Sequence, residues 1–291
     1  MAKFSSRKEC YIHLDLDFND SRASYKRAID FVDANSIKYS LSSNVLTDLG
    51  GREKKSVPEL FANDYVWSES HPGRVQTKPQ QGTRIIFELD KDNSPLACEN
   101  FMAICTGEKG LSKQSSLPLH YKDTKIHRYH KGLGIIQGGD IQFGNGTGGE
   151  SIWGKKFKDD VKGLKGKHDK KGVLSMGNGG KNSNTSQFFI CLKHTGAPVC
   201  DKKHVVFGQL LHGEDTLQLM QKMIDDEEES GENVMDAENA YAYKDPALEE
   251  GPPMRIVITG CGEWNPASDL VQGFYDEADV FQPLSNGEKE E

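Results

Sequence analysis

The stretch Gly172-Val-Leu-Ser-Met-Gly-Asn-Gly-Gly-Lys-Asn-Ser-Asn-Thr-Ser-Gln-Phe-Phe-Ile190 sets two short apolar runs on either side of a segment rich in Gly, Asn and Ser. The same pattern extends over residues 126–207, where short apolar runs are broken by many Gly and Asn residues. Short strands separated by turn residues are typical of a closed or nearly closed antiparallel sheet. We therefore predict a mainly β protein.

Two further strands are predicted nearer the N-terminus. Residues Cys10 to Asp17 alternate apolar and polar side chains, the pattern of a half-buried strand, and Thr83 to Leu89 would pair with them. Residues 18–81 lie between these runs and differ in character, being rich in Ser, Asn, Asp and Lys with one helix-like stretch around Ser24 to Ala34. We interpret them as an insertion within the first hairpin.

Two helices are predicted outside the insertion. Asn93 to Cys105 has a Pro near its start, apolar residues at helical spacing and a stop at Thr106-Gly107, and Asp215 to Met223 is amphipathic. The stretch Asp225 to Glu238 contains eight carboxylates and no base, so we expect an extended, solvated loop before a last strand at Met254 to Gly260. Residues 264–291 form a tail without clear periodicity.

Composition narrows the function classes. A net charge of -8 disfavours nucleic-acid binding, and we expect the basic run Lys155 to Lys171 to be a solvated loop. No apolar run is long enough to span a membrane, and the N-terminus has no apolar signal region, so we expect a cytoplasmic or nuclear address. Six cysteines without C-x-x-C spacing and nine dispersed histidines predict no metal site, no disulfide framework and no cofactor.

Eight short motifs make the assignment more specific. They occur in the order and approximate spacing of the cyclophilin family, which the chain resembles over residues 8–17 and 82–263. The motifs are Glu99-Asn-Phe101, Cys105-Thr-Gly-Glu-Lys-Gly110, His127-Arg128, Gln137-Gly-Gly-Asp140, Asn145-Gly-Thr-Gly-Gly149, Gly172-Val-Leu-Ser-Met176, Ser186-Gln-Phe-Phe-Ile190 and Lys203-His-Val-Val-Phe-Gly208. The resemblance implies an eight-stranded antiparallel closed barrel capped by two α-helices, with residues 18–81 inserted and 264–291 appended.

The resemblance also implies peptidyl-prolyl cis/trans isomerisation in proline-containing clients, as in protein folding. Rotation about an X-Pro bond faces a barrier of ~18–20 kcal/mol because the C–N bond has partial double-bond character. A catalyst needs a fixed donor aimed at the imide nitrogen and an apolar pocket for the proline ring. By resemblance, Arg128 is that donor and Gln137 orients it and touches the substrate backbone.

The substrate-binding residues follow from the same resemblance, with two departures. Leu133 to Ile135 stand where the family has an aromatic residue and a methionine, after one extra residue, and Val199 stands where a tryptophan commonly anchors cyclosporin. We therefore expect an apolar but less aromatic pocket and weak cyclosporin binding. The predicted substrate-binding residues are Leu133, Ile135, Asn178, Gln187, Phe189, Val199 and His204.

A more local resemblance concerns the loop from Gly110 to Tyr121. It is similar to that of the divergent-loop cyclophilins, which also carry a cysteine pair and a glutamate corresponding to Cys105, Cys261 and Glu150. Oxidation of the two thiols could then release Glu150 from the loop and alter the pocket. The alternative is two buried thiols and a carboxylate that only holds the loop.

A different class of function also fits the sequence. The chain could be a catalytically weak peptide-binding or scaffold component, joined to a larger assembly through residues 18–81 or through the C-terminal tail. The aromatic residues Phe31, Phe61, Tyr65 and Trp67 of the insertion suit either a small core, which we favour, or a partner surface. The tail mixes apolar residues with acids, which suits a segment that becomes ordered on a partner.

Overall fold

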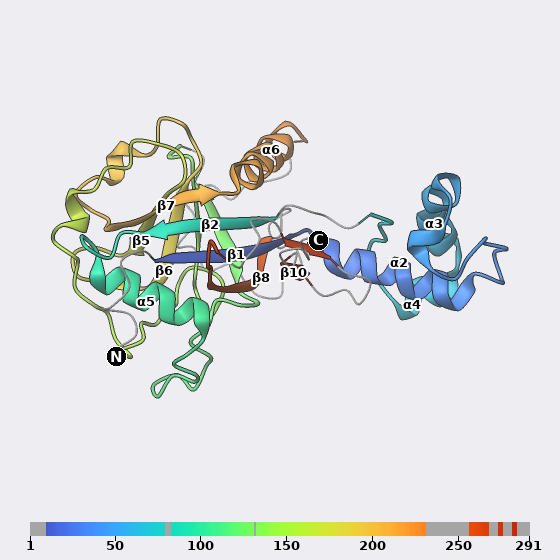
Figure 1. Ribbon diagram of the computed structural model, residues 1–291, viewed down its shortest axis with the longest axis horizontal. Helices are drawn as coiled ribbons and strands as arrows, with labels where there is room; N and C mark the ends of the chain where they lie inside the picture. Colours follow the sequence, from blue (N-terminus) through green and yellow to red (C-terminus); the bar gives the residue numbers. More distant parts are fainter. Residues whose placement is uncertain are drawn as a thin grey trace, which may run out of the picture.

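Eight strands close into an antiparallel barrel, as predicted. The structure is a computed structural model that describes residues 10–78, 83–130, 132–230 and 256–267 and the short strands 273–275 and 281–283. Around the barrel the strand order is β1-β2-β7-β5-β6-β4-β3-β8 (Figure 1). The strands are β1 Tyr11–Phe18, β2 Arg84–Leu89, β3 Lys125–His130, β4 Ile135–Gly138, β5 Val173–Asn178, β6 Asn184–Cys191, β7 Val206–His212 and β8 Ile256–Glu263.

Alternation along the strands fills the barrel. In β1 the side chains of Ile12, Leu14 and Leu16 are fully buried in the main core, because successive side chains of a strand point to opposite faces. Strand β1 pairs with β2, as predicted, and with β8 on its other side, so that Leu14 lies opposite both Ile85 and Cys261. The barrel therefore places a strand from near the start of the chain beside one from near its end.

Two helices pack against the barrel, as predicted. Helix α5 (Pro95–Thr106) begins with Pro at its first turn and ends at Gly107, whose φ of 66° suits glycine. Helix α6 (Glu214–Ser230) buries Leu217 and Met220 in the main core. The prediction of an extended acidic loop is wrong for residues 225–230, because the acidic run continues this amphipathic helix and Glu is a good helix former. Residues 231–238 lie outside the described part of the chain.

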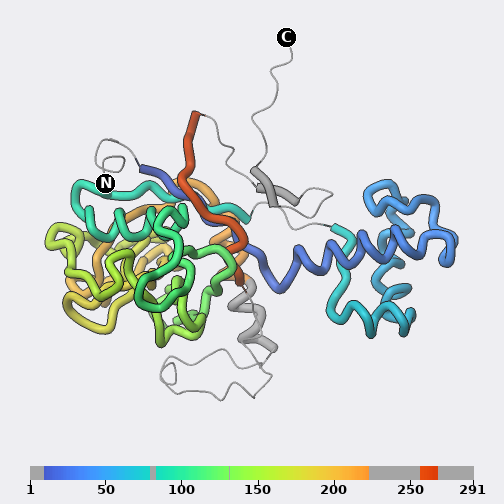
Figure 2. Tube along the Cα trace, turned by 90° about the horizontal axis from the view of Figure 1, so that it is seen from below, coloured from blue at the N-terminus to red at the C-terminus, as the bar shows by residue number. Residues whose placement is uncertain are grey.

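Residues of the insertion form a separate helical unit beside the barrel (Figures 1 and 2). It contains α2 (Ser21–Asn35), the short 3-10 helix η1 (Leu46–Asp48), α3 (Gly51–Asn63) and α4 (Tyr65–Ser70). The helix-like stretch Ser24 to Ala34 lies within α2, as predicted. The sequence did not indicate α3 and α4, because Pro58 interrupts the helical pattern of α3 and α4 is only six residues long.

Phe31 is the centre of the insertion's own core. Its ring centroid lies 5.4 Å from that of Phe61, 5.7 Å from that of Trp67 and 5.6 Å from that of Tyr39. The predicted aromatic core is therefore correct for Phe31, Phe61 and Trp67. It is wrong for Tyr65, which is 70% exposed because its side of the short helix α4 faces away from the core.

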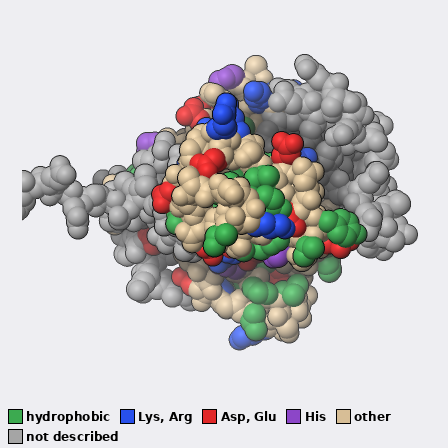
Figure 3. All heavy atoms as spheres, turned by 90° about the vertical axis from the view of Figure 1, so that its right-hand side faces the viewer, with side chains coloured by type: hydrophobic (Ala, Val, Ile, Leu, Met, Phe, Trp, Pro, Cys, Tyr) green, Lys and Arg blue, Asp and Glu red, His purple; other side chains and the backbone are tan. Residues whose placement is uncertain are grey.

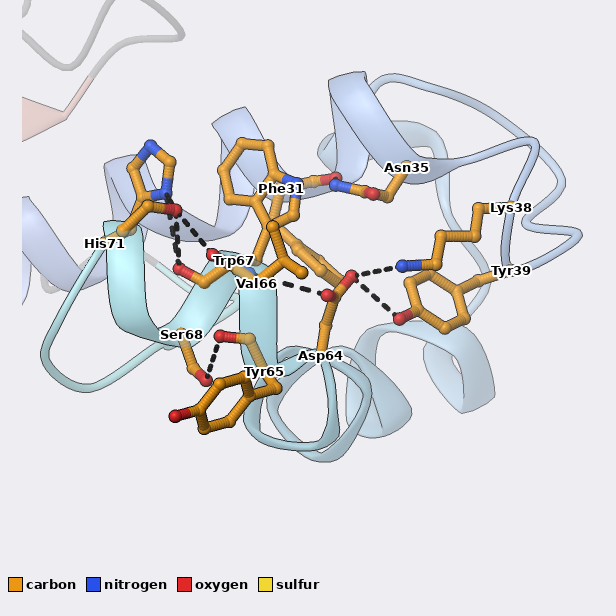
Figure 4. A network of polar contacts seen from close by, with 11 residues as sticks. Phe31, Asn35, Lys38, Tyr39, Asp64, Tyr65, Val66, Trp67, Ser68 and His71 are labelled. Carbon is orange, nitrogen blue, oxygen red and sulfur yellow. Dashed lines mark hydrogen bonds and ion pairs between the residues drawn. The ribbon is translucent and has the colours of Figure 1, made fainter.

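A buried carboxylate fixes the start of α4. Asp64 Oδ2 accepts hydrogen bonds from Lys38 Nζ at 2.8 Å and from Tyr39 Oη at 2.9 Å, and Oδ1 accepts from Trp67 N at 3.4 Å (Figure 4).

Exposed apolar side chains remain on the insertion, and Figure 3, which views the molecule from this end, shows several of them. The exposed large apolar residues of the insertion are Ile37, Val45, Tyr65 and Val66.

The C-terminal tail contains a small separate sheet, formed by β9 (Gly273–Tyr275) and β10 (Phe281–Pro283) in antiparallel register. The sequence showed no periodicity there because each strand has only three residues. Within the described residues, no helix combines the length and the apolar character that a membrane span needs.

Candidate active site

Strand β6 presents two different apolar faces. Phe188 and Ile190 point into the barrel core, whereas Phe189 and Cys191 belong to a second cluster on the outer face. Ile135, Val173, Ala197 and Cys200 complete this outer cluster, and Leu133 and Val206 pack at its edge. A strand that is apolar on both faces needs cover on its outer face, and the surrounding side chains leave Phe189 only 2% exposed and Cys191 fully buried.

Three predicted site residues lie in one row across neighbouring strands. Arg128 of β3 is opposite Gln137 of β4, and Gln137 is opposite Phe189 of β6. Neighbouring strands lie ~4.7–4.9 Å apart and side chains in one row point to the same face. The fold therefore brings Arg128, Gln137 and Phe189 together on the outer face, although they span more than sixty positions of sequence.

Arg128 has an uncommitted donor. Its Nε is buried and has no hydrogen-bond partner within the described residues. Buried donors are nearly always paired, so an unpaired one beside an apolar cluster is a candidate ligand contact. The guanidinium is permanently protonated and carries five donors in a fixed fork. The structure thus places a cationic donor in this row, and its role in catalysis stays a prediction.

Gln137 is held by a second glutamine. Its Nε2 donates to Gln187 Oε1 at 2.6 Å, and Gln187 Nε2 donates to the carbonyls of Gly146 and Gly148 at 2.9 and 2.6 Å. Gln137 is opposite Arg128 in the strand register, and the described residues show no side-chain hydrogen bond between the two. The two glutamines form a polar strip beside the Phe189 ring.

Leu133 and Ile135, the predicted apolar wall, pack in the same cluster as Phe189. Ile135 is buried against Phe189 and Leu133 packs at the edge of the same cluster. The extra residue of this segment is absorbed in a turn, in which Gly134 has a φ of 63° and its N–H donates to the His130 carbonyl at 2.8 Å. On the opposite side Cys200 is buried, whereas Val199 is 55% exposed. The wall is therefore apolar and lacks a flat aromatic surface.

Two histidines support the Phe189 ring. His204 meets it edge-on with centroids 5.2 Å apart, and His168 stacks on it with centroids 5.6 Å apart. His204 Nδ1 lies 3.0 Å from the Met176 carbonyl oxygen, and His168 bridges Ser175 Oγ and Asp201 Oδ1 at 2.9 and 3.0 Å. Burial lowers the pKa of both imidazoles, so both are neutral at pH 7.

His168 is a site residue that sequence reasoning missed. It is fully buried, and Phe157, Asp160 and Gly163 of the same segment are buried as well. The prediction that Lys155 to Lys171 is a solvated loop is therefore wrong for these residues. Lysines dominate the composition of this segment. The isolated apolar and imidazole side chains among them were the signal that could have indicated burial.

Asn178 lies at the end of β5, opposite Asn184 of β6. Its Nδ2 donates to the Lys203 carbonyl at 3.1 Å, and its Oδ1 accepts from Gly180 N at 3.2 Å. The side chain is thus engaged within the protein, which fits a role in which the backbone contacts the peptide. The structure leaves the assignment of a substrate contact to Asn178 as a prediction.

Glu150 holds the loop from Gly110 to Tyr121. Its carboxylate accepts hydrogen bonds from the Ser112 and Ser115 hydroxyls, the second at 2.7 Å. Cys261 Sγ lies 3.5 Å from His120 Nε2, and that nitrogen lies 3.1 Å from the Cys105 carbonyl oxygen. All six cysteines are free thiols. Burial raises the pKa of Cys105 well above its usual range and that of Cys261 to about 12, so both thiols are protonated.

Comparisons with known proteins agree with this geometry. The family model for cyclophilin type peptidyl-prolyl cis-trans isomerases matches residues 74–239, more than half of the chain. A curated relative, the peptidyl-prolyl cis-trans isomerase cyp11 of Rhizopus delemar, is 47% identical over 153 residues, which cover 52% of this chain and 44% of the relative. The chain therefore spans less than half the length of that relative.

Proposed function

Since the chain belongs to the cyclophilin family, we propose that its barrel catalyses cis/trans isomerisation of X-Pro bonds in protein or peptide clients. The observation that carries the proposal is the buried, unpartnered Nε of Arg128 in the same row as the Phe189 ring. A proline ring on Phe189 would bring its imide nitrogen toward this donor. Donation there favours a pyramidal nitrogen and weakens the partial double bond that resists rotation.

The pocket around the proline contributes by excluding water. Ile135, Leu133 and Cys200 surround Phe189 with apolar atoms, and the neutral His168 and His204 avoid placing a charge beneath the ring. In such an environment a hydrogen bond from the guanidinium to the imide is stronger than it is in water. Gln137 and Gln187 supply polar groups for the peptide backbone on either side of the rotating bond. No covalent intermediate is needed.

The rival function is a peptide-binding or scaffold role with slow turnover. The loss of an aromatic wall at Leu133 to Ile135 favours it, because a flat ring would have offered roughly 150–250 Å² of contact surface. Both functions use the same groove. They differ in whether Arg128 lowers the rotation barrier.

The test is an NMR exchange assay on an Ala-Pro peptide with the full chain, Arg128→Ala and Arg128→Lys. Loss of one preorganised donor typically costs about 100-fold in rate. We expect the full chain to accelerate exchange and Arg128→Ala to lose about that factor, with Arg128→Lys intermediate at best because it lacks the planar fork. Arg52→Ala, an exposed arginine of the insertion, is the matched control. A folded full chain that binds the peptide without accelerating exchange would establish the scaffold role instead.

Weak cyclosporin binding follows from the proposed groove. Val199 is largely exposed and offers no ring or N–H at the rim. Stoichiometric inhibition of the isomerase by low nanomolar drug would contradict this expectation. Val199→Trp should tighten inhibition if the missing ring is its cause.

Control of the loop by oxidation stays a separate proposal. The location of Cys105 and Cys261 around His120 supports it, whereas their raised pKa values make attack on an oxidant slow. Mass spectrometry after peroxide treatment would detect a disulfide between them, and an unchanged isomerase rate in the oxidised protein would contradict a role in control. Clients, further partners and the expected cytoplasmic or nuclear address stay predictions.

A further inference from the structure

A cavity lies where the barrel meets the insertion. Its volume is about 360 Å³, within the range of ~300–1,000 Å³ that is typical of small-molecule sites. Its lining comes from the end of β1, the first turn of α2 and the segment that follows α4. None of these elements contributes a residue to the proposed isomerase site, so the cavity is a separate feature of the molecule.

Hydrogen bonds to α2 hold the outer wall of the cavity in place. The segment after α4 runs back along α2, where Gln76 N donates to the Ser24 carbonyl at 3.3 Å and Gln76 Nε2 donates to the Ser21 carbonyl at 3.0 Å. Arg27 Nε donates to the Arg74 carbonyl at 2.8 Å. The wall is therefore fixed through the backbone, and its side chains are not needed to keep the cavity open.

The lining of the cavity is cationic. Among the described residues that form it, none is acidic, and two carry a positive charge, Arg74 and Lys78. Both are exposed, and neither side chain makes an ion pair or hydrogen bond with the rest of the described chain. Asp17, just before the lining, accepts hydrogen bonds from the Ser21 hydroxyl and from Arg22 N, the second at 3.2 Å. In a chain with a net charge of -8, this hollow attracts anions rather than metal cations.

Neutral side chains complete the lining. Phe18 and Val75 supply apolar atoms, Phe18 from the barrel core and Val75 from the edge of the insertion's core. Ser24 Oγ accepts a hydrogen bond from Arg27 Nη2 at 3.2 Å, which leaves the hydroxyl proton of Ser24 as a donor. The cavity therefore combines two cations and a hydroxyl donor with a small apolar surface.

We propose that this cavity binds a phosphate monoester, with Arg74 and Lys78 on the phosphate and the apolar atoms of Phe18 and Val75 against the organic group. A phosphate monoester carries about -1.5 to -2 charges at pH 7, so two cations match it, whereas a carboxylate needs only one. The guanidinium adds a planar fork that donates to two phosphate oxygens at once. The inference is independent of the isomerase function, because the two sites share no residue.

The test is an NMR titration of the full chain with phenyl phosphate, followed through the ³¹P signal of the ligand and the amide signals of the protein. Inorganic phosphate and phenol, each of which has only one half of the ligand, are titrated in parallel. We expect saturable binding of phenyl phosphate that is tighter than binding of either half. Binding of phenol as tight as that of phenyl phosphate would overturn the proposal, because the charge would then play no part.

Two double variants with the same change in net charge locate the site. Arg74→Gln/Lys78→Gln should weaken binding of phenyl phosphate by roughly three- to thirtyfold, the size expected for two partly exposed charge pairs. Arg52→Gln/Lys55→Gln, which removes two exposed cations of α3, should leave the affinity unchanged. Equal weakening in the two variants, or none in either, would overturn the proposal.

Two further measurements make the result specific. Arg74→Lys keeps the charge and loses the planar fork, so its affinity should lie between those of the full chain and the first double variant. The exchange rate of an Ala-Pro peptide should be the same in both double variants, which separates this site from the isomerase site.

A short blocked peptide with a phosphotyrosine at its centre identifies the source of the phosphate. Affinity equal to that of phenyl phosphate would support the proposal and assign the site to phosphorylated proteins. Binding of phenyl phosphate alone would also support it and assign the site to free phosphate esters.

Discussion

The barrel and the insertion are built in opposite ways. The barrel's functional surface joins β3, β4 and β6, and its site residues meet only because strands far apart in sequence pair in register. The insertion packs Phe31, Phe61 and Trp67 from helices that follow one another along the chain, and its core is separate from that of the barrel. The contrast suggests that the insertion contributes a surface and the barrel contributes the chemistry, and that each can be damaged without the other.

The largest effect that would sharpen this contrast is expected from Phe31→Ala. Its ring is fully buried and touches three other aromatic rings, and truncation of a buried Phe typically costs about 3–5 kcal/mol. We expect the helices of the insertion to unfold at lower denaturant, as seen by circular dichroism, with the isomerase rate on a short peptide retained. A loss of that rate in parallel with the helical signal would show that the two regions depend on each other.

A pH effect should be confined to the barrel. Burial lowers the pKa of His127 to about 4, below its ordinary value of 6.5, so between these values the unfolded chain binds a proton that the folded chain does not. Stability is therefore full above about pH 6.5 and falls on acidification. At about 1.36 kcal/mol per pKa unit the loss from pH 7 to pH 5 is roughly 2 kcal/mol.

The control for this effect is His127→Gln, which keeps a polar side chain of similar size and cannot titrate. The free energy of unfolding of this variant, measured in urea at pH 7 and pH 5, should fall by roughly 2 kcal/mol less than that of the unchanged protein. His130, His168 and His204 also have lowered pKa values and contribute to the pH dependence that remains. If both proteins lost the same free energy of unfolding between pH 7 and pH 5, a neutral, buried His127 would be contradicted.

A smaller effect is expected where one buried carboxylate holds a loop. Glu150→Gln replaces a charged acceptor of the Ser112 and Ser115 hydroxyls by a neutral one, which should cost about 1 kcal/mol. Hydrogen exchange should increase in residues 110–121 and leave the insertion unaffected. If hydrogen exchange in Glu150→Gln increased equally in residues 110–121 and in the insertion, the loop would be coupled to the whole molecule.

The smallest effect should come from Tyr65→Ser. This residue is 70% exposed on α4, and surface substitutions usually change stability by less than about 0.5 kcal/mol. Thermal unfolding should be unchanged, in contrast to that of Phe31→Ala in the same unit. A marked destabilisation would mean that Tyr65 is packed in solution.

The same contrast governs what the sequence could predict. Period-two alternation and the turn residues indicated the barrel, and the helical stretch inside α2 was visible because its apolar residues have helical spacing. Helices α3 and α4 were missed because Pro58 and the short length of α4 hide the pattern. The helical part of the acidic run was missed because eight carboxylates without a base favour an extended, solvated loop.

At the site, the resemblance to the cyclophilin family indicated Arg128, Gln137 and Phe189, and the strand register places the three in one row. It could not indicate that Gln137 donates to Gln187, or that His168 supports the Phe189 ring from within a lysine-rich run. Contacts made by loops are set by tertiary packing rather than by local pattern.

The most direct test of the account compares Arg128→Ala and Phe31→Ala in one experiment that records both the exchange rate of an Ala-Pro peptide and the helical unfolding transition. The account predicts a crossed result: Arg128→Ala loses about 100-fold in rate with its unfolding unchanged, and Phe31→Ala unfolds early with its rate retained. An Arg128→Ala protein that keeps the full rate, or a Phe31→Ala protein that loses it, would contradict the claim that catalysis resides in the outer groove of the barrel alone.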